Sequence, residues 1–312
     1  MLPASHRTSI RHCSTLSIVD PVHPDPALDY ADAVRRFAAL AARDGPQISS
    51  PGRSRFFGHR RRTERALVFI HGFTNCPQQW VLFASGVHAA GATVVIPRLP
   101  GHGHFDRATR AAARPSAAQV LETIHAAVDI ARGAAERTIL VGLSIGGTIG
   151  PSVALARDDI AHTVAMVPFF AVKGFDEART RRLSALLQHL PNASVPWDPF
   201  GDGSQIPSYG YPKFSTKMLG RFLQIGSDVD TIASVRAPAG KTTFVLNAKE
   251  PATENPVTLA VCEKFERARS GSTQAVVWDD LPANHDIIDP TNPNARIDLV
   301  YPRLRAIVDG SL

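Results

Sequence analysis

Hydrophobic residues in the first half of this chain form short continuous runs, which alternate with longer stretches whose apolar positions recur every three or four residues. Short apolar runs bounded by turn residues are typical of buried strands, and the longer spacing is typical of amphipathic helices. Repeated strand–helix units of this length predict an α/β fold with a mostly parallel central sheet and helices on both faces. The expected elements are a strand at 66–70, a helix at 77–90, a strand at 93–97, a helix at 116–132, a strand at 138–142, a helix at 145–156 and a strand at 162–167.

The alternation of strands and helices stops at residue 168 and resumes near residue 239. Between these points lie an amphipathic stretch at 183–190, a region rich in Pro, Gly and aromatic residues at 191–214, and an apolar stretch at 218–225. The elements expected after this segment are a strand at 242–247, a helix at 256–269, a strand at 274–278 and a final helix over 297–307. Pro302 is expected to kink that final helix or to divide it in two.

The start of the chain precedes the alternating pattern. Its first 30 or so residues are rich in Pro, His and Ser and predict a loose extension, after which one amphipathic helix is expected at 27–42 and a short strand near Phe56 and Phe57. The predicted division of the chain is an N-terminal extension at 1–64, an α/β core formed by 65–167 and 239–312, and an insertion at 168–238.

Two of the predicted helices carry recognisable end signals. Pro77 suits a first helical turn, and Gly91 suits a C-terminal stop. Ser116 and Gln119 form a capping box, and Gly133 is expected to close the helix that they begin.

A candidate nucleophile follows the predicted strand at 138–142. The sequence there is Gly142-Leu143-Ser144-Ile145-Gly146, and a helix is expected directly after it. This strand–turn–helix context makes the G-x-S-x-G pattern a nucleophile elbow, a sharp turn on which the serine is exposed. Small residues two positions before and after the serine let strand and helix approach closely. Ser144 is therefore the candidate nucleophile of a serine hydrolase.

A serine nucleophile needs a histidine that takes its proton and a carboxylate that orients the histidine. Glu250 follows the predicted strand at 242–247, and His285 follows the predicted strand at 274–278. Both residues would then lie with Ser144 at the carboxyl edge of the sheet, where open α/β sheets place their chemistry. The candidate triad is Ser144, Glu250 and His285.

Two other carboxylates could compete with Glu250. Glu254 lies four residues further on and could be the orienting acid or a charge at a helix N-terminus, but Glu250 follows its strand more closely. Asp286 is adjacent to His285, and neighbours in an extended segment point apart, so we do not expect Asp286 to be the partner of that histidine.

The charge that develops on a substrate carbonyl oxygen needs backbone N–H donors. The predicted strand at 66–70 runs into His71-Gly72-Phe73-Thr74, where Gly72 permits a tight turn. We expect one oxyanion donor to be the amide of Phe73 and the other to be the amide of Ile145.

These motifs resemble those of the α/β-hydrolase superfamily, and in particular those of bacterial esterase-like and lipase-like members. The resemblance covers roughly residues 64 to 309 apart from a variable middle, and it implies an α/β-hydrolase fold with a cap inserted at 168–238. Glu250 stands where such enzymes usually have Asp, and the H-G-F loop departs from the glycine-rich H-G-G-G form. The blocks that carry the resemblance are H-G-F-T-N-C-P-Q-Q at 71–79, P-R-L-P-G-H-G-H at 97–104, the glycine-rich elbow at 142–147 and H-D-I-I-D-P at 285–290.

The expected activity is cleavage of a carboxylic ester of a small or medium-chain acyl compound, through an acyl-enzyme intermediate and with no cofactor or metal. An acyltransferase or a thioesterase would use the same triad, and both stay open as alternatives. A non-catalytic binding protein on this scaffold is a further alternative, which the intact Ser144 and His285 disfavour. The aromatic residues of the insertion could line an acyl pocket or could form a small core of their own: Phe169, Phe170, Phe175, Trp197, Phe200, Tyr209, Tyr211, Phe214 and Phe222.

Composition agrees with a globular enzyme, since 44% of the residues are hydrophobic and 20% are charged. No apolar run is long enough for a membrane span, and the first residues lack the apolar core of a secretory signal, so we expect a cytoplasmic location. Cys13, Cys76 and Cys262 lie far apart and predict neither disulfides nor a zinc site. The pair His102 and His104 has no third ligand at a suitable spacing, so no metal is expected there.

A net charge of +6 raises the question of nucleic-acid binding. The densest basic run, Arg60-Arg61-Arg62-Thr63-Glu64-Arg65, has no interleaved aromatic residues and belongs to no recognisable nucleic-acid module. We expect this run to be a solvated loop and the partner to be a small-molecule ester, while a homo-oligomer stays open.

Overall fold

The computed structural model describes residues 22–197 and 206–310. Their strands form a sheet of seven strands in the order β1-β3-β2-β4-β5-β8-β9, in which β1 is antiparallel to β3 and every other pair is parallel. The predicted, mostly parallel central sheet is confirmed. The strands are β1 (Arg55–Phe57), β2 (Thr63–Ile70), β3 (Thr93–Ile96), β4 (Ala135–Leu143), β5 (His162–Met166), β8 (Lys241–Asn247) and β9 (Thr273–Trp278).

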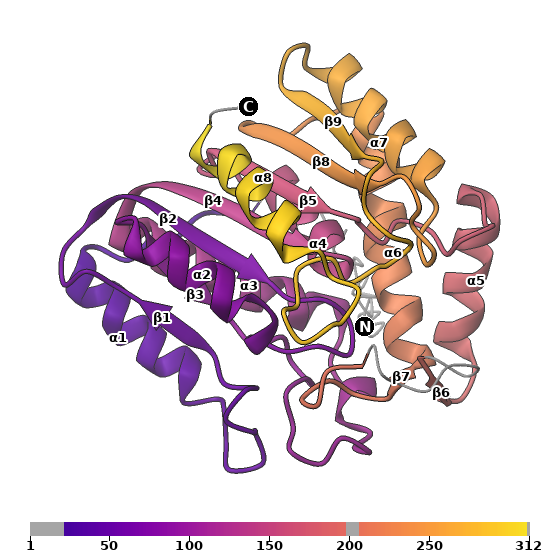
Figure 1. The fold of residues 1–312 in the computed structure, drawn as a ribbon, viewed down its shortest axis with the longest axis horizontal. Helices are drawn as coiled ribbons and strands as arrows, with labels where there is room; N and C mark the ends of the chain where they lie inside the picture. The colour runs from indigo at the N-terminus through magenta and orange to yellow at the C-terminus, as the bar shows by residue number, and fades with distance from the viewer. Residues whose placement is uncertain (1–21, 198–205, 311–312) are drawn as a thin grey trace, which may run out of the picture.

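Helices cover both faces of this sheet, as predicted, and α8 crosses the near face in Figure 1. Alternate residues of β2 point to opposite faces: Leu67 and Phe69 pack against α2, whereas Val68 and Ile70 pack in the core that α3 and α4 share. Both faces are therefore buried, which explains the continuous apolar runs of the sequence. The flanking helices are α1 (Tyr30–Ala41), α2 (Gln78–Ala89), α3 (Ala117–Ala134), α4 (Ile145–Leu155), α7 (Asn255–Ala268) and α8 (Ile297–Asp309).

The segment 168–238 supplies two further helices and a small hairpin. The helices α5 (Glu177–His189) and α6 (Thr216–Ala233) lie side by side at the right-hand end of Figure 1, and β6 (Ser194–Pro196) pairs with β7 (Lys213–Ser215). The helix α6 is longer than the apolar stretch at 218–225 suggested. Its buried residues, Phe222 among them, join the core cluster that also contains α3 and α4, so this segment is not an independent layer.

The helix end signals are confirmed except at Gly133. Ser116 Oγ accepts from the Gln119 N–H at 3.1 Å while Gln119 Oε1 accepts from the Ser116 N–H at 2.9 Å, and Gly91 adopts φ of +96° after α2. Gly133 lies inside α3 instead of ending it. A Cβ at Gly133 would come within 2.5 Å of the Ala27 Cβ, so this glycine serves the close approach of the N-terminal segment.

Of the two outcomes expected at Pro302, a kink or a division of the last helix, the division is wrong. Pro302 does not divide the last helix, because α8 runs unbroken from Ile297 to Asp309. Its buried Val300, Leu304 and Ile307 pack on the sheet, which offsets the roughly 3 kcal/mol that an internal proline costs.

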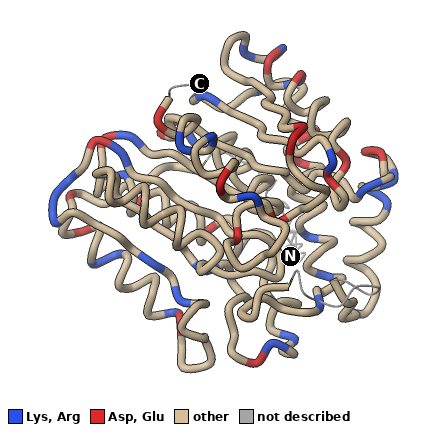
Figure 2. Tube along the Cα trace, viewed as in Figure 1, with Lys and Arg blue, Asp and Glu red and all other residues tan. Residues whose placement is uncertain are grey.

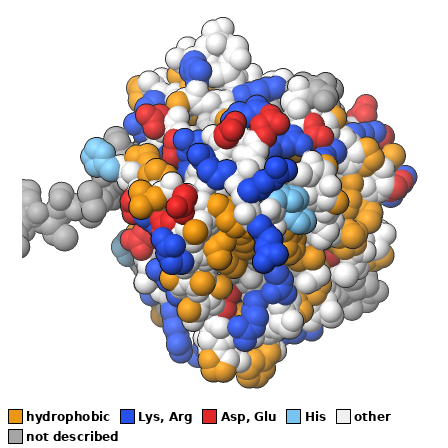
Figure 3. Space-filling view, turned by 90° about the vertical axis from the view of Figure 1, so that its left-hand side faces the viewer, with side chains coloured by type: hydrophobic (Ala, Val, Ile, Leu, Met, Phe, Trp, Pro, Cys, Tyr) orange, Lys and Arg blue, Asp and Glu red, His pale blue; other side chains and the backbone are white. Residues whose placement is uncertain are grey.

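The basic run is not wholly a loop. Strand β2 begins at Thr63 and includes Glu64 and Arg65, which pair with Arg137 and Asp309 respectively. Figure 2 shows Lys and Arg beside Asp and Glu at this left-hand edge, and Figure 3, which views the molecule from that side, shows basic side chains interspersed with hydrophobic and acidic ones. Within residues 22–197 and 206–310, no helix has the length and apolar character that crossing a membrane requires.

Candidate active site

Ser144 lies on a strained turn between β4 and α4. Its backbone adopts φ of 59° and ψ of −118°, a conformation that non-glycine residues rarely take. The two glycines of the motif are required by close packing. A Cβ at Gly142 would lie 2.1 Å from the Gly146 carbonyl oxygen, and a Cβ at Gly146 would lie 2.2 Å from the Ile70 oxygen. The local sequence therefore forces the serine out at the carboxyl end of the sheet.

The structure brings the three candidate catalytic residues together. His285 Nε2 lies 2.8 Å from Ser144 Oγ, and His285 Nδ1 lies 2.8 Å from Glu250 Oε1. The Glu250 side chain is fully buried and that of His285 is 11% exposed. Glu250 Oε1 also accepts from the N–H groups of Ala252 and Thr253, at 2.8 and 3.3 Å. The imidazole is thus held between a hydroxyl and a backbone-anchored carboxylate.

The competing carboxylates lie elsewhere. Glu254 precedes α7, where its Oε2 accepts from the Gly174 N–H at 2.7 Å. Asp286 points away from its neighbour His285 and accepts from Gln79 Nε2 at 2.8 Å. Among the three acids that the sequence offered, Glu250 is the one hydrogen-bonded to His285.

Charges around His285 favour its protonated form. Burial by itself lowers the pKa of His285, but the charge and the hydrogen bond of Glu250, together with the charge of Asp286, outweigh this effect and raise it. Burial and the neighbouring Asp289 raise the pKa of Asp286 to about 6. Its two oxygens accept hydrogen bonds from four N–H donors, as the oxygens of an ionised carboxylate do.

Asparagine side chains hold the loop that carries His285. Asn247, at the end of β8, donates from Nδ2 to the carbonyl oxygens of Pro282 and Asn284 at 2.9 and 3.0 Å. Asn284 Nδ2 in turn donates to the Asp286 carbonyl oxygen at 2.8 Å. These asparagines could not be predicted from the sequence, because an asparagine at a strand end has no local pattern that reveals a partner some 35 residues away.

The H-G-F loop lies directly against the serine. The position of a Cβ on Gly72 would be 3.7 Å from the Ser144 Cβ. The Gly72 N–H donates to Gln79 Oε1 at 2.8 Å, so that amide is occupied and the next one, of Phe73, is the candidate donor. Ile145 is the first residue of α4, where N–H groups have no acceptor within the helix. Both predicted oxyanion donors therefore flank Ser144.

His71 and His102 have structural partners. His71 Nε2 accepts from the Leu99 N–H at 3.1 Å, and its Nδ1 donates to the Gly72 carbonyl oxygen at 3.0 Å. Burial holds the pKa of His71 well below its usual value. His102 Nδ1 lies 3.0 Å from the Pro100 oxygen. Across the described ranges, no three His, Cys, Asp or Glu side chains are grouped so that they could hold a metal ion.

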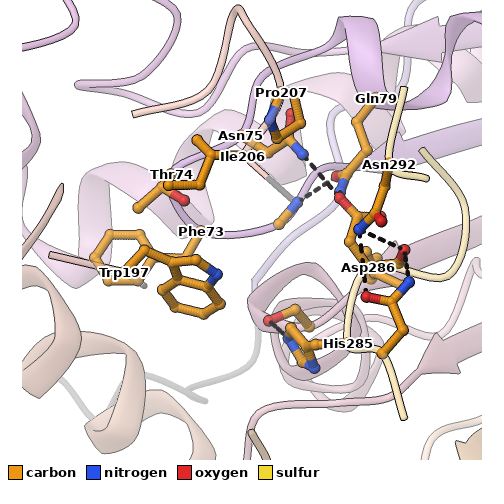
Figure 4. Close-up of a pocket in the computed structure, with 14 residues that line it drawn as sticks. Phe73, Thr74, Asn75, Gln79, Trp197, Ile206, Pro207, His285, Asp286 and Asn292 are labelled. Atoms are coloured by element: carbon orange, nitrogen blue, oxygen red, sulfur yellow. Dashed lines mark hydrogen bonds between the residues drawn. The ribbon is translucent and has the colours of Figure 1, made fainter. Parts of the chain in front are cut away.

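Two cavities share Phe73, Trp197 and His285 as lining residues, and the smaller one is also lined by Ser144. The smaller cavity, of about 60 Å³, is called the polar cavity here because Thr74, Asn75, Gln79, Asp286 and Asn292 are among its lining residues, and Figure 4 shows it with Trp197 at one side. A larger cavity of about 330 Å³ is mostly apolar. It is lined by Phe73, Phe169, Val172, Trp197, Phe214, Leu219, Pro251, Ala252 and His285.

The predicted aromatic set is divided between cavity and core. Phe169, Trp197 and Phe214 line the apolar cavity, whereas Phe170 and Phe222 are buried in the core. Tyr209 and Tyr211 make hydrogen bonds through their hydroxyls, and Phe175 is half-buried. Phe200 lies outside the described residues.

The fold and the sequence define the class of protein. The Alpha/beta hydrolase family signature matches residues 67–296, so this chain belongs to the alpha/beta hydrolase family, and the predicted α/β-hydrolase fold is confirmed. No protein of curated function has significant sequence similarity to the chain. The resemblance of the 71–79 block to particular esterase-like members stays a prediction.

Solved structures with this fold include lipolytic enzymes. One comes from a description of LipS and LipT, two metagenome-derived lipolytic enzymes. It has a TM-score of 0.65 at 19% identity, and the alignment covers 85% of this chain and 100% of the other. A monoglyceride lipase from Saccharomyces cerevisiae has a TM-score of 0.63 at 15% identity, covering 83% and 90%. A Paleococcus ferrophilus monoacylglycerol lipase has a TM-score of 0.62 at 17% identity, covering 82% and 96%. At these identities the likeness concerns the fold alone.

Proposed function

We propose that this chain is a serine hydrolase that cleaves carboxylic esters through an acyl-enzyme intermediate. The observation that carries the proposal is the continuous pair of 2.8 Å contacts from Ser144 Oγ to His285 and from His285 to Glu250. A serine hydroxyl is a weak nucleophile until a positioned base takes its proton. The lipolytic enzymes that share the fold support an ester substrate.

The proposed reaction follows from this geometry. His285 Nε2 takes the proton of Ser144 as Oγ attacks the ester carbonyl, and the amides of Phe73 and Ile145 hold the resulting oxyanion. His285 then donates that proton to the leaving alcohol. A water that gives a proton to the same histidine then attacks the acyl-enzyme. The second tetrahedral intermediate releases the acid as His285 returns that proton to Ser144 Oγ. Glu250 orients the imidazole and stabilises its positive form in both halves of the reaction.

The two cavities suit the two parts of an ester. The apolar cavity of about 330 Å³ lies beside His285 and would take the acyl chain. The polar cavity of about 60 Å³ touches Ser144 and has room for water or a small alcohol. We propose that the segment 168–238 acts as the cap of the site, because it contributes Phe169, Trp197 and Phe214 to the acyl side.

The test of the function is a fluorophosphonate probe followed by a panel of p-nitrophenyl esters. Acyl-coenzyme A and alcohol acceptors are included in the panel, because an acyltransferase would yield a new ester in place of free acid. Labelling with release of free acid supports the hydrolase. Labelling with formation of a new ester would identify a transferase, and absence of labelling would leave a binding protein.

The first expected property concerns the pH at which kcat/KM falls on the acidic side of its profile. This pH should be higher than it would be for a free histidine. His285 accepts a proton only when it is neutral, so activity should fall as the pH drops through its pKa. Because Glu250 and Asp286 raise that pKa, the midpoint should lie above the value of about 6.5 for a free histidine. A pH profile of kcat/KM measures it, and a midpoint below 6.5 would contradict the proposed electrostatics.

The second expected property is a chain-length limit set by the apolar cavity. Each buried methylene contributes about 0.8 kcal/mol, so kcat/KM should rise roughly fourfold per carbon until the acyl chain fills the cavity. Leu219, on α6, lines that cavity, and Leu219→Ala should move the limit to longer chains. The measurement is kcat/KM for p-nitrophenyl esters of increasing acyl length.

Leu186→Ala is the matched control for this experiment. Leu186 lies on α5 in the same segment, is 54% exposed and does not line the cavity. Its replacement should leave the chain-length profile unchanged. A Leu219→Ala protein that stays folded and keeps the original profile would show that acyl selectivity arises elsewhere.

A further inference from the structure

Gln79 connects the two loops that flank Ser144. It is a buried residue near the start of α2, and its side chain has a partner at each end. Oε1 accepts from the Gly72 N–H at 2.8 Å, and Nε2 donates to Asp286 Oδ2 at 2.8 Å. Gly72 immediately precedes Phe73, and Asp286 immediately follows His285. One amide thus links the neighbour of the proposed oxyanion donor to the neighbour of the proposed base.

The chemistry of its partners fixes the orientation of this amide. The Gly72 N–H can only donate, so it requires the oxygen of Gln79. The ionised Asp286 carboxylate can only accept, so it requires the nitrogen. Methionine has the same length but can satisfy neither partner strongly, and glutamate can satisfy Gly72 alone.

Asp286 is itself firmly held, so it gives Gln79 a fixed anchor. Its Oδ2 accepts from Gln79 and from Asn75 Nδ2, and its Oδ1 accepts from the N–H groups of Ile288 and Asp289 at 3.4 and 3.2 Å. Figure 4 shows Asn75, Gln79 and Asp286 meeting on the side of the polar cavity away from Trp197. The four donors satisfy both carboxylate oxygens.

The network continues from this anchor into the segment 168–238. Asn75 Nδ2 also lies 3.5 Å from Asp289 Oδ2, to which the Tyr209 hydroxyl donates at 2.5 Å. The segment 168–238 is therefore tied through Tyr209 to the carboxylates that anchor Gln79.

The direction of the Phe73 N–H depends on the backbone of Gly72. Glycine has no Cβ and adopts many conformations, so its two peptide planes need external support. The Gly72 carbonyl accepts from His71 Nδ1 at 3.0 Å and from the Asn75 N–H at 3.2 Å, which holds the plane that contains the Phe73 N–H. In a trans peptide that N–H points opposite to the carbonyl. The preceding plane is held by Gln79.

We propose that Gln79 is a positioning residue that aims the Phe73 amide at the oxyanion by joining Gly72 to Asp286, an inference that rests on the proposed function. Gln79 does not touch the reacting atoms in this role. Its loss should therefore weaken binding of the tetrahedral intermediate while leaving binding of the ground-state ester nearly unchanged.

Gln79→Met tests this role. We expect kcat for p-nitrophenyl esters to fall by about 10- to 100-fold with KM changed less than about threefold, because misplacing an oxyanion donor costs less than the roughly 10² to 10³ of losing it. Affinity for a trifluoromethyl ketone, whose adduct with Ser144 carries an oxyanion, should fall by the same factor as kcat/KM. Gln78→Met is the matched control, since Gln78 lies on the same helix and its side chain makes none of these contacts.

Gln79→Glu separates positioning from a loss of folding. Its carboxylate can still accept from Gly72 but would face Asp286, so the bridge would form only when the two acids share a proton. The activity of Gln79→Glu relative to the unaltered chain should therefore rise as the pH falls, a trend that a merely structural defect would not produce. Because the added carboxylate also acts on the pKa of His285, each pH profile is first corrected for its own His285 titration before the ratio is taken. The titratable groups around this position are Asp286, Asp289, His285, His71, Cys76, Tyr209 and Tyr301.

The outcomes separate the two proposals. If the unaltered chain neither labels with a fluorophosphonate nor hydrolyses esters, the proposed function fails and this inference fails with it. If the unaltered chain is active, either of two results overturns the inference alone: Gln79→Met and Gln78→Met with equal kinetics, or a Gln79→Glu ratio independent of pH. Should Gln79→Met not fold, as judged by its thermal unfolding midpoint, the pH dependence of Gln79→Glu decides.

Discussion

Replacing Ser144 by alanine is expected to abolish covalent labelling by a fluorophosphonate and to lower ester turnover by about 10⁴ to 10⁶. The substitution removes the atom that attacks the carbonyl, so no acyl-enzyme can form. A residual rate above that of water should persist, because the Phe73 and Ile145 amides and the two cavities would still bind the substrate. Labelling followed by mass spectrometry of the modified peptide, together with initial rates, measures both effects.

Ser152→Ala provides the control for that experiment. Ser152 is also buried and lies on α4, two turns beyond the elbow, so the same substitution is made in the same helix. Labelling and turnover should stay close to those of the unaltered chain. Persistent labelling of Ser144→Ala would identify a different nucleophile and would refute the proposed mechanism.

Neutralising Glu250 should have the second largest effect. Glu250→Gln is expected to lower kcat/KM by about 10³ to 10⁴, because a neutral amide no longer stabilises the imidazolium that forms on His285. The backbone N–H groups of Ala252 and Thr253 should keep the amide oxygen directed at Nδ1, so the loss reports mainly the charge. Without that charge the pKa of His285 should fall, and the acidic limb of kcat/KM should move to lower pH.

Glu254→Gln is the comparison that assigns the acid. Glu254 contacts the Gly174 N–H and lies near Lys173, so its neutralisation should change the rate little. The rates and pH profiles of Glu250→Gln and Glu254→Gln show which of the two carboxylates orients His285. A larger loss in Glu254→Gln than in Glu250→Gln would move the orienting role to Glu254 and would require a different arrangement in solution.

The sheet and the serine elbow could be predicted because their causes are local. Strands buried on both faces are nearly continuously apolar, and the runs at 66–70 and 138–142 have this composition. The elbow is equally local. Gly142 and Gly146 are needed within four residues of each other, since any Cβ there would collide with the facing backbone. Their spacing around Ser144 is therefore visible in the sequence.

Features that depend on distant partners were predicted less well. Strand β2 begins at Thr63, three residues before the apolar run, because Thr63 pairs with Ala135 of the neighbouring strand. Pro302 remains within a helix because the sheet holds the apolar face of α8. In both places tertiary contacts outweigh the local preference of the chain.

The sequence by itself determined the order of the elements, the turn at Ser144 and the short set of residues from which a triad could be chosen. Only the tertiary structure decided that Glu250 contacts His285 while Glu254 binds the backbone at Gly174, and that Gln79 joins Gly72 to Asp286. The reason is physical: backbone strain and burial periodicity act over a few residues and leave a pattern in the sequence. A hydrogen bond between side chains far apart in sequence depends on where two loops meet, and that meeting leaves no local pattern.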